Sequence, residues 1–318
     1  MHSKIMILLS EERHQRLMQC AETILQEIAG SFGHVFSLRY EKIGSLSIDS
    51  YESELTEETV DACKECQAVF LDNGNAIGSD ALLDALDARL ILRYCGVPFG
   101  VSSSPFDFWL AKVRSLDSVS LKEAVDQAYH VAEKMVVPVT HIQPNGNSSV
   151  LWNKELQAHA LLHCATPTSK HTPQSAAYAL LKNPESLGVF LTPPYAGALY
   201  MPLAQTLCEA PYAVHEISLG KEHAVYSAIH DCNGNASLSI VGYAMALSSM
   251  LRITLQLERE ADCMDSALRN VLEYGWRTPD MMPTDESKVI TPEEMTDLIC
   301  EQISLAGQLM QDVGEIIS

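Results

Sequence analysis

Residues 34–73 read HVFSLRYEKIGSLSIDSYESELTEETVDACKECQAVFLDN, and this stretch sets the pattern for the rest of the chain. The runs HVFSLRYEKI and AVFLDN, at its two ends, are rich in apolar and β-branched residues and predict two strands. Between them, Thr56 with Thr59 and the acidic pair Glu57 and Glu58 predicts the start of a helix. A strand, a helix and a second strand in succession indicate a parallel sheet covered by helices.

The same alternation continues along the chain and predicts an α/β fold. Further strands are expected at Lys4–Leu9, Gly96–Val101 and Met135–Ile142. Helices are expected at Arg13–Ala29, Leu82–Leu92, Lys122–Lys134 and Trp152–Cys164, throughout Ala236–Asn270, and after Thr291–Pro292. The long apolar stripes around Ile240–Leu257 suggest a helical interface with another subunit, although burial inside one chain explains them equally well.

The composition bounds the classes of partner. The 318 residues carry 41 acidic against 21 basic side chains, a formal net charge of -20. Because phosphate affinity requires clustered Lys and Arg, this balance argues against binding to nucleic acid or to an anionic membrane. No apolar run is long enough to span a membrane. Without a signal peptide, and with an odd count of nine scattered cysteines, the chain is expected in the reducing cytoplasm.

The stretch TPPYAGALYMP (192–202) follows the apolar run Val189–Leu191, which predicts a buried strand. Ligands of α/β proteins commonly bind just past the carboxyl ends of such strands. This segment, however, contains no carboxylate, histidine or lysine, and its polar groups are one threonine and two tyrosines. The expected active-site loop is therefore bare of the charged groups that usually carry catalysis.

Several stretches resemble one family, the decarboxylating β-hydroxyacid dehydrogenases, which comprise isopropylmalate and isocitrate dehydrogenases. These are GSLSIDSYESELTEETVDACKECQAVFLDN (44–73), TPPYAGALYMPLAQTL (192–207), HEISLGKEHAVYSAIH (215–230), LRITLQLEREADCMDSALRNVLEYGWRTPDM (251–281) and VITPEEMTDLICEQI (289–303). The resemblance implies an isopropylmalate dehydrogenase-like doubly wound fold in two discontinuous lobes. Residues 1–98 plus 252–318 would form the cofactor-side lobe, and residues 99–251 the second lobe with interface helices. It also implies a homodimer, or a hetero-oligomer with an active paralogue.

The metal site that the resemblance implies is not conserved in residue type. The family's two aspartates fall on Ala198 and Pro202, and its third aspartate falls near Gln174. A hard cation such as Mg²⁺ prefers carboxylate oxygens, which none of these residues supplies. The family Mg²⁺ site is therefore expected to be lost, and no metal is expected.

The substrate-binding arginines of the family align with Asp87 and Val97. An aspartate in place of an arginine would repel an anionic substrate. Arg89 and Arg93 lie nearby in the sequence, but on the expected helix they would point elsewhere.

The proton-transferring groups are missing as well. The position of the family's lysine falls on Pro144 and that of its aspartate neighbour on Gln143. His141 or Lys154 would have to replace the lysine, and the family's tyrosine has no counterpart.

The cofactor site is expected to be altered rather than absent. At the N-terminus, LLSEERHQR replaces the family's glycine-rich loop, which keeps the backbone further from a ligand. NAD or another nucleotide is expected at two remaining loops, with His230 matching the family's adenine-loop histidine. The candidate cofactor-binding residues of these loops are His230, Asp231, Asn233, Asn235, Asn73 and Gly74.

Other patterns have a structural and a chemical interpretation. His159 and His163 are four residues apart on a helix, as in zinc sites, but without a clear third ligand such a pair is more often structural. Cys63 and Cys66 lack the strand-to-helix setting of a redox pair. His215 with Glu216 is less specific still.

Three functions follow from these observations. No catalytic residue is assigned in the first, a catalytically degenerate homologue that binds a ligand or a partner. The second is an enzyme with altered, metal-independent chemistry that uses His141, Asp72 or His230. The third is an NAD(P)-dependent dehydrogenase of the 3-isopropylmalate type, acting on a 2-hydroxy acid.

Overall fold

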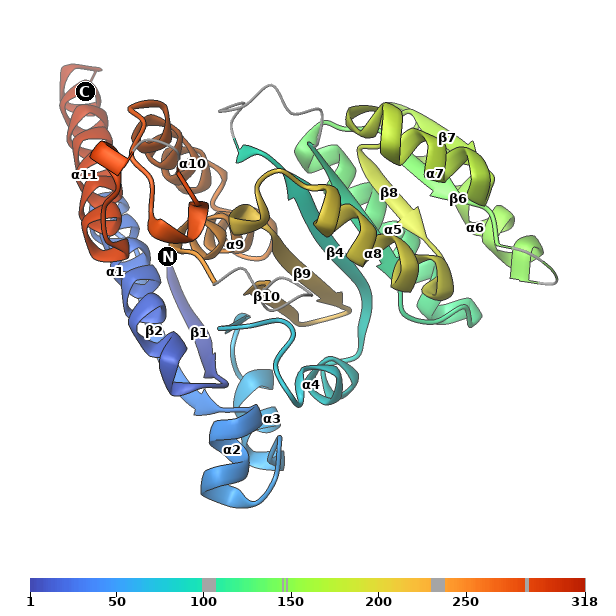
Figure 1. The fold of residues 1–318 in the computed structure, drawn as a ribbon, viewed down its shortest axis with the longest axis horizontal. Helices are drawn as coiled ribbons and strands as arrows, with labels where there is room; N and C mark the ends of the chain where they lie inside the picture. The colour runs from blue at the N-terminus through green and yellow to red at the C-terminus, as the bar shows by residue number, and fades with distance from the viewer. Residues whose placement is uncertain (99–106, 145, 147, 230–237, 284–285, 318) are drawn as a thin grey trace. The chain divides into compact units, whose positions relative to one another are not determined.

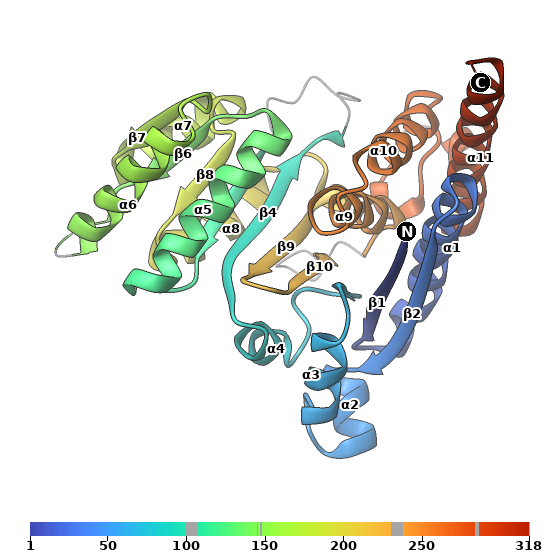
Figure 2. The same cartoon turned by 180° about the vertical axis from the view of Figure 1, so that it is seen from behind.

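A computed structural model describes residues 1–98, 107–144, 146, 148–229, 238–283 and 286–317 (Figures 1 and 2). The chain forms two compact units. The first comprises Met1–Leu82 with Val225–Ser318, and the second comprises Leu83–Ala224. The sequence places the lobe boundaries at residues 98 and 252. In the structure, helix α9 (Ile240–Ile253) belongs to the first unit.

The first unit is built on parallel strands in the order β2-β1-β3-β10. Their bounds are β1 His2–Leu9, β2 Val35–Lys42, β3 Ala68–Leu71 and β10 Ala224–Ala228. The larger helices pack as a group in which α1 contacts both α9 and α11, and α10 contacts α9 and α11. The helices are α1 Gln15–Phe32, α2 Gly44–Tyr51, α3 Glu57–Lys64, α9 Ile240–Ile253, α10 Glu258–Glu273 and α11 Pro292–Ile317, with α4 Ser79–Ala85 at the crossing into the second unit.

Local signals in the opening stretch are confirmed. Residues 34–73 contain β2 and β3, and Thr56 caps α3 by accepting a hydrogen bond from the N–H of Thr59 at 3.1 Å. The acidic residues Glu57 and Glu58 occupy the first turn of α3, where they favour the positive end of the helix dipole.

The second unit has strands in the order β9-β4-β5-β8-β6-β7. Strand β4 is antiparallel to β5 and β9, whereas β5, β8, β6 and β7 run parallel. Helices α5 and α6 cover one face and α7 and α8 the other (Figures 1 and 2). The bounds are β4 Ala88–Gly96, β5 Asp107–Val113, β6 Val139–Ile142, β7 Thr168–His171, β8 Val189–Thr192, β9 His215–Gly220, α5 Ser118–Met135, α6 Ser148–Leu162, α7 Pro173–Lys182 and α8 Pro194–Leu207.

Three sequence predictions of local structure are wrong. The expected helix over Leu82–Leu92 is the end of short helix α4 followed by strand β4, which is buried because β5 and β9 flank it. The expected loop at 192–202 is mostly helix α8, which begins at Pro194 directly after β8. The expected strand at Gly96–Val101 is not continued past Gly96, where β4 ends; Val97 and Pro98 are not in a strand, and the rest of this stretch lies outside the described residues. The helical pattern expected over Ala236–Asn270 is confirmed among the described residues as two helices, α9 and α10, separated at Gln256, whose φ is 55°.

The apolar stripes around residues 240–257, for which a subunit interface was suggested, do not form an exposed apolar surface. Nearly all of α9 is buried, with Val241, Tyr243 and Leu247 among its core residues. Burial inside one chain therefore explains this apolar pattern. None of the helices among the described residues is long and apolar enough to cross a membrane.

Helix α5 ends on an unusual residue. Val136 closes the helix in the left-handed region, with a φ of 55°, and accordingly donates its N–H back to the carbonyls of Ala132 and Glu133. Glycine is common at such positions, whereas a β-branched side chain is strained there. The Val136 side chain is also 90% exposed, so buried contacts do not offset this strain.

We expect Val136→Gly to raise the free energy of unfolding by about 1 kcal/mol, because relief of left-handed strain exceeds the added entropy of the unfolded chain. Urea denaturation measures the change. The matched control is Val136→Ala, which shortens the side chain but keeps a Cβ at the same backbone conformation. Equal stability of the glycine and alanine variants would contradict the assignment of strain.

Candidate functional site

A buried carboxylate organises the carboxyl-terminal edge of the sheet in the first unit. Asp72 directly follows β3, and its Oδ2 accepts hydrogen bonds from the N–H of Ser10 at 2.8 Å and of Glu11 at 3.4 Å. His14 Nδ1 lies 2.9 Å from the same oxygen. Ser10–His14 follow β1, the neighbour of β3, so one carboxylate fixes the loop that leaves the adjacent strand.

Helix α9 hydrogen-bonds to the main chain at Asp72 through Tyr243. The Tyr243 hydroxyl donates to the carbonyl oxygen of Asp72 at 2.8 Å, and its ring packs 5.8 Å from the ring of Phe70. Burial, with the negative charge of Asp72 adding to it, raises the pKa of Tyr243 well above its usual value. Tyr243 is therefore a fixed neutral donor at this edge of the sheet.

Two buried polar atoms at this edge have no hydrogen-bond partner among the described residues: Asp72 Oδ1 and Ser10 Oγ. Buried polar groups are normally paired, because an unpaired one loses its hydration without compensation. In open α/β sheets, ligands bind at the carboxyl ends of strands. The edge therefore offers one carboxylate acceptor and one hydroxyl to a bound molecule.

The turn after Asp72 contains two of the candidate cofactor residues, Asn73 and Gly74, and both form hydrogen bonds with other residues of the chain. Asn73 Oδ1 accepts the N–H of Asn75 at 3.1 Å, and Gly74 donates its N–H to the carbonyl of Ala228 at 3.1 Å. A Cβ at Gly74 would lie 2.5 Å from Ser227 Oγ, so a larger residue would displace the Ser227 side chain of β10. Contact of Asn73 and Gly74 with a cofactor stays a prediction.

The other candidate cofactor residues, His230, Asp231, Asn233 and Asn235, lie outside the described residues. Strand β10, which ends at Ala228, lies beside β3 and runs parallel to it. The chain after β10 therefore leaves the sheet from the same edge as Asp72. Among residues that the sequence analysis did not single out, the structure adds Ser10, His14 and Tyr243 to this edge.

The positions aligned with the family's metal ligands lie in the second unit. Ala198 and Pro202 are on the exposed face of α8, and Gln174 is exposed in the first turn of α7. The neighbours of Ala198 and Pro202 on that face are Leu199 and Leu203, so the surface is apolar. Within the described part of the chain, no group of three or more His, Cys, Asp or Glu residues is placed to hold a metal ion.

Both arginines near the expected substrate-binding positions are engaged by the protein itself. They lie on strand β4, not on a helix. Arg93 is buried, and its Nη2 and Nε donate to Glu216 Oε2 at 2.7 and 3.1 Å while Nη1 donates to Gln205 Oε1 at 3.0 Å. Arg89 pairs with Asp87 at 2.6 Å and with Glu123 at 3.5 Å. Their positive charges are compensated within the second unit.

Two histidines, the catalytic candidate His141 and His215 of the less specific cluster, are buried and poor proton acceptors. Burial lowers the pKa of His141 to about 4, with Lys170 and His171 adding to the effect, and Trp152 Nε1 donates to its Nδ1 at 3.3 Å. Burial also lowers the pKa of His215 to about 4; its ring packs on the rings of Tyr94 and Trp109. Both imidazoles are neutral at neutral pH. Of the other positions considered for proton transfer, Lys154 is exposed on α6 and Pro144 is buried.

The paired histidines and the paired cysteines have structural surroundings. His159 and His163 stack with 7° between their ring planes, and each ring also stacks on Tyr129. His163, the residue after α6, has its Nδ1 2.7 Å from Glu133 Oε1 of α5. Cys63 and Cys66 are buried, and burial raises the pKa of the Cys63 thiol to about 12, which disfavours the reactive thiolate.

Comparison with known proteins gives consistent results. The chain is 20% identical to 3-isopropylmalate dehydrogenase of Aquifex aeolicus, over 94% of this chain and 97% of the relative. It is 24% identical to the same enzyme of Rhodopirellula baltica, over 93% and 97%. No family model matches the chain.

Solved structures show the same fold. Isocitrate dehydrogenase of Methylococcus capsulatus superimposes with a TM-score of 0.78 at 14% identity, over 96% of this chain and all of that chain. A beta-decarboxylating dehydrogenase of Thermococcus kodakarensis also gives 0.78 at 14% identity, over 95% and 96%. The architecture is thus that of the decarboxylating dehydrogenases. The chain is also similar in sequence, over almost its whole length, to 3-isopropylmalate dehydrogenases.

We expect Asp72→Asn to lower the free energy of unfolding by about 2 kcal/mol, because hydrogen bonds to a charged acceptor are stronger than those to an amide. Urea denaturation measures the loss. Asp49→Asn, an exposed aspartate of α2, is the control and is expected to be neutral within about 0.5 kcal/mol. A loss at Asp72 no larger than at Asp49 would contradict the role given to this carboxylate.

Proposed function

We propose that this chain is a catalytically degenerate member of its family that binds a nucleotide, such as NAD, at the carboxyl edge of the first unit. The carrying observation is the apolar face of α8, where Ala198 and Pro202 occupy the positions aligned with metal-binding aspartates. Polarising the substrate of a decarboxylating dehydrogenase requires a cation held by oxygen ligands. Neither residue has a side-chain oxygen.

The state of the arginines supports the same proposal. A substrate carboxylate would have to compete with Glu216 for Arg93 and with Asp87 for Arg89. Separating the buried Arg93–Glu216 pair would leave an uncompensated charge in the interior, which is strongly unfavourable. Arg93 therefore stabilises the second unit rather than binds an anionic substrate, and the more exposed Arg89 has Asp87 beside it, which repels an anion.

Nucleotide binding is supported by the chemistry of the edge around Asp72. A buried carboxylate oxygen and a serine hydroxyl accept hydrogen bonds from hydroxyl groups, such as those of a ribose. The same carboxylate repels phosphate, so a ligand would place its ribose and not its phosphates near Asp72. This binding requires no metal.

An enzyme with metal-independent chemistry is the second candidate. His141 would be its base, but this side chain is 5% exposed and its Nδ1 already accepts a hydrogen bond from Trp152. The third candidate, an NAD(P)-dependent dehydrogenase acting on a 2-hydroxy acid, requires metal ligands from residues other than those aligned with the family's aspartates.

A thermal-shift titration with NAD, NADP, AMP and isopropylmalate, each with and without Mg²⁺, separates these candidates. A ligand at a hundredfold above its dissociation constant should stabilise the chain by about 2.7 kcal/mol. We expect one nucleotide to do so equally with and without Mg²⁺, and no NADH or NADPH to form with isopropylmalate. Mg²⁺-dependent stabilisation by isopropylmalate, with reduction of the cofactor, would overturn the proposal.

Ser10→Ala locates the binding. It removes the unpartnered hydroxyl and keeps the N–H that Asp72 accepts, so nucleotide affinity should fall with little change in stability. Its matched control is Ser3→Ala, which removes an equally buried, unpartnered hydroxyl from the opposite end of β1. Equal affinity of the two variants would place the nucleotide elsewhere.

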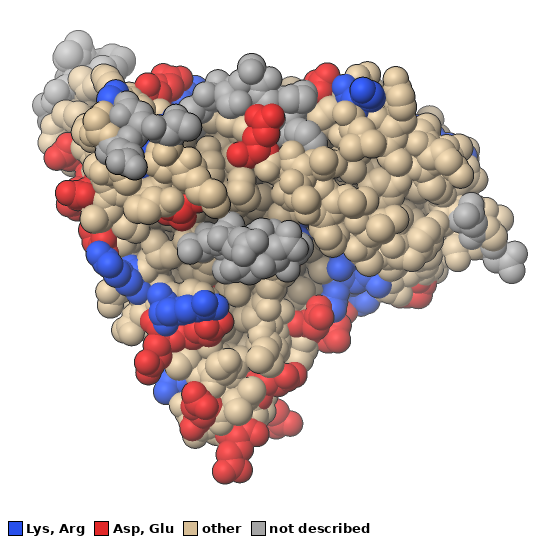
Figure 3. Space-filling view, viewed as in Figure 1, with Lys and Arg blue, Asp and Glu red and all other residues tan. Residues whose placement is uncertain are grey.

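We also propose that the chain forms a homodimer through the α7–α8 surface, defined as the exposed apolar side chains of these two helices. They are Tyr178, Leu181, Tyr195, Leu199, Leu203 and Leu207. Those of α8 recur every four residues and form one stripe, and α8 contains no charged residue. Figure 3 shows a largely uncharged area there. Since copies of a chain with net charge -20 repel one another, an uncharged apolar face is the surface on which they can associate.

Leu199→Glu with Leu203→Glu should convert the dimer to a monomer in sedimentation equilibrium, because the four charges of a symmetric pair would be buried without partners. Leu161→Glu, on α6 and 81% exposed, is the control and should leave the mass unchanged. A monomeric parent chain that forms a complex with an active dehydrogenase would favour a hetero-oligomer instead.

We also propose a cytoplasmic location. The free state of all eight cysteines among the described residues agrees with it.

A further inference from the structure

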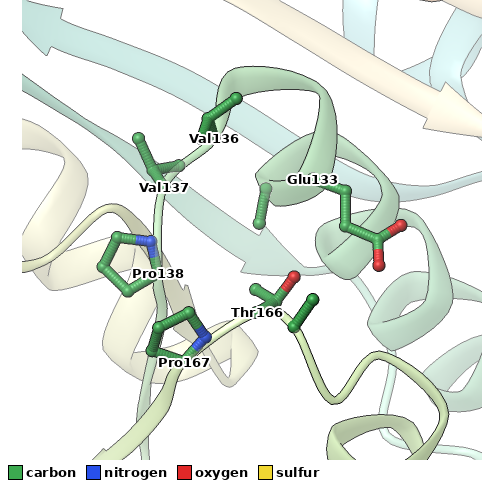
Figure 4. A pocket seen from close by; sticks show the side chains of 8 residues that line it. Glu133, Val136, Val137, Pro138, Thr166 and Pro167 are labelled. Atoms are coloured by element: carbon green, nitrogen blue, oxygen red, sulfur yellow. The ribbon is translucent and has the colours of Figure 1, made fainter.

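A groove in the second unit is lined by none of the residues discussed so far as cofactor, metal or substrate ligands. It has a volume of about 580 Å³ and lies between the C-terminal end of α5 and the segment that leads into β7 (Figure 4). Its lining residues are Ala132, Glu133, Val136, Val137, Pro138, Ala165, Thr166 and Pro167. Strands β6 and β7 begin just after it, so it is at the end of the strands opposite to the carboxyl edge. Small-molecule sites have volumes of this order.

The walls of the groove are apolar and include a strained residue. Six of its eight lining residues are Ala, Val or Pro. Val136 presents a side chain that is 90% exposed, at a φ where glycine would be unstrained. An exposed valine contributes little to the stability of the isolated chain, and backbone strain is often stored at sites of function. A ligand in the groove would remove this side chain from water.

One charged residue, Glu133, lines the groove, and its carboxylate lies at the edge away from residues 136–138 (Figure 4). Its Oε1 is held by His163 Nδ1 at 2.7 Å, and the side chain is 41% exposed. The last turn of α5 adds the negative end of a helix dipole at the same place, and Lys134 of that turn does not line the groove. Apolar walls with a fixed negative group at one side are complementary to an apolar molecule that carries a positive charge.

We propose that this groove binds a small amphipathic cation, an apolar body that bears an ammonium group. The apolar body packs against Val136, Val137 and Pro138, and the ammonium donates to the carboxylate of Glu133. His163 positions that carboxylate. The site uses no residue of the nucleotide edge and is independent of the proposed nucleotide binding.

Three probes that share a phenethyl group and differ in charge test the ligand class by isothermal titration calorimetry. Phenethylammonium is expected to bind at least about tenfold more tightly than phenethyl alcohol, because a charge-assisted hydrogen bond replaces a neutral one. 3-Phenylpropionate, an anion, should bind more weakly than the alcohol. Equal affinities for all three probes, or no binding of the ammonium probe, would overturn the proposal.

Glu133→Gln tests the carboxylate. It should remove the preference for phenethylammonium over phenethyl alcohol while leaving the affinity for the alcohol unchanged. The matched control is Asp126→Asn, also on α5, whose Oδ1 lies 3.6 Å from His159 Nε2 but which does not line the groove. A similar effect of both substitutions would show that general surface charge, and not this groove, attracts the cation.

Val136→Gly tests the apolar wall without the risk of an unfolded variant, because this substitution is expected to stabilise the chain. Affinity for phenethylammonium should fall about fivefold to tenfold while the charge preference persists. A more stable variant with unchanged affinity would overturn the location of the site.

Discussion

The carboxylate of Asp72 is the interaction on which the edge of the first unit depends. An ionised group is expensive to bury unless its oxygens are hydrogen-bonded, and here one oxygen satisfies two main-chain N–H groups and the ring of His14. The segment after β1 contains no glycine that would let it turn tightly. Instead, the Asp72 carboxylate at the end of β3 fixes the conformation of residues 10–14 through hydrogen bonds.

The sequence predicted the parts of the fold that depend on neighbours within a few residues. The strand–helix–strand order over 34–73 was accessible because periodicity and the Thr56 cap are local signals. Strand β4 was not, because its two arginines interrupt an apolar run and suggest a solvated helix face. The partners that allow Arg93 to be buried, Glu216 and Gln205, are 123 and 112 residues further along the chain. No short window contains that information.

The same distinction applies to the sites. Asn73 and Gly74 were found because a turn is recognised from consecutive residues. Their hydrogen bonds, however, are to Asn75 and Ala228 of the same chain. His14 and Tyr243 act on Asp72 from 58 and 171 residues away, and neither has a local pattern that indicates this role. On α8, the sequence showed that the expected aspartates are absent. It took the helical geometry to show that Ala198 and Pro202 share an exposed apolar face with Leu199 and Leu203.

The division of the chain into units has a consequence for biosynthesis. The second unit is one continuous segment, Leu83–Ala224, whereas the first requires both ends of the chain. Helix α1 packs against α9 and α11, so an emerging N-terminal segment lacks the surfaces that bury its apolar face until the last hundred residues or so have been made. The second unit has all its own strands and helices before then. During translation, residues 1–82 therefore cannot complete their unit until residues 225–318 have been made. Their strand edges and apolar helix faces stay exposed while the middle of the chain folds.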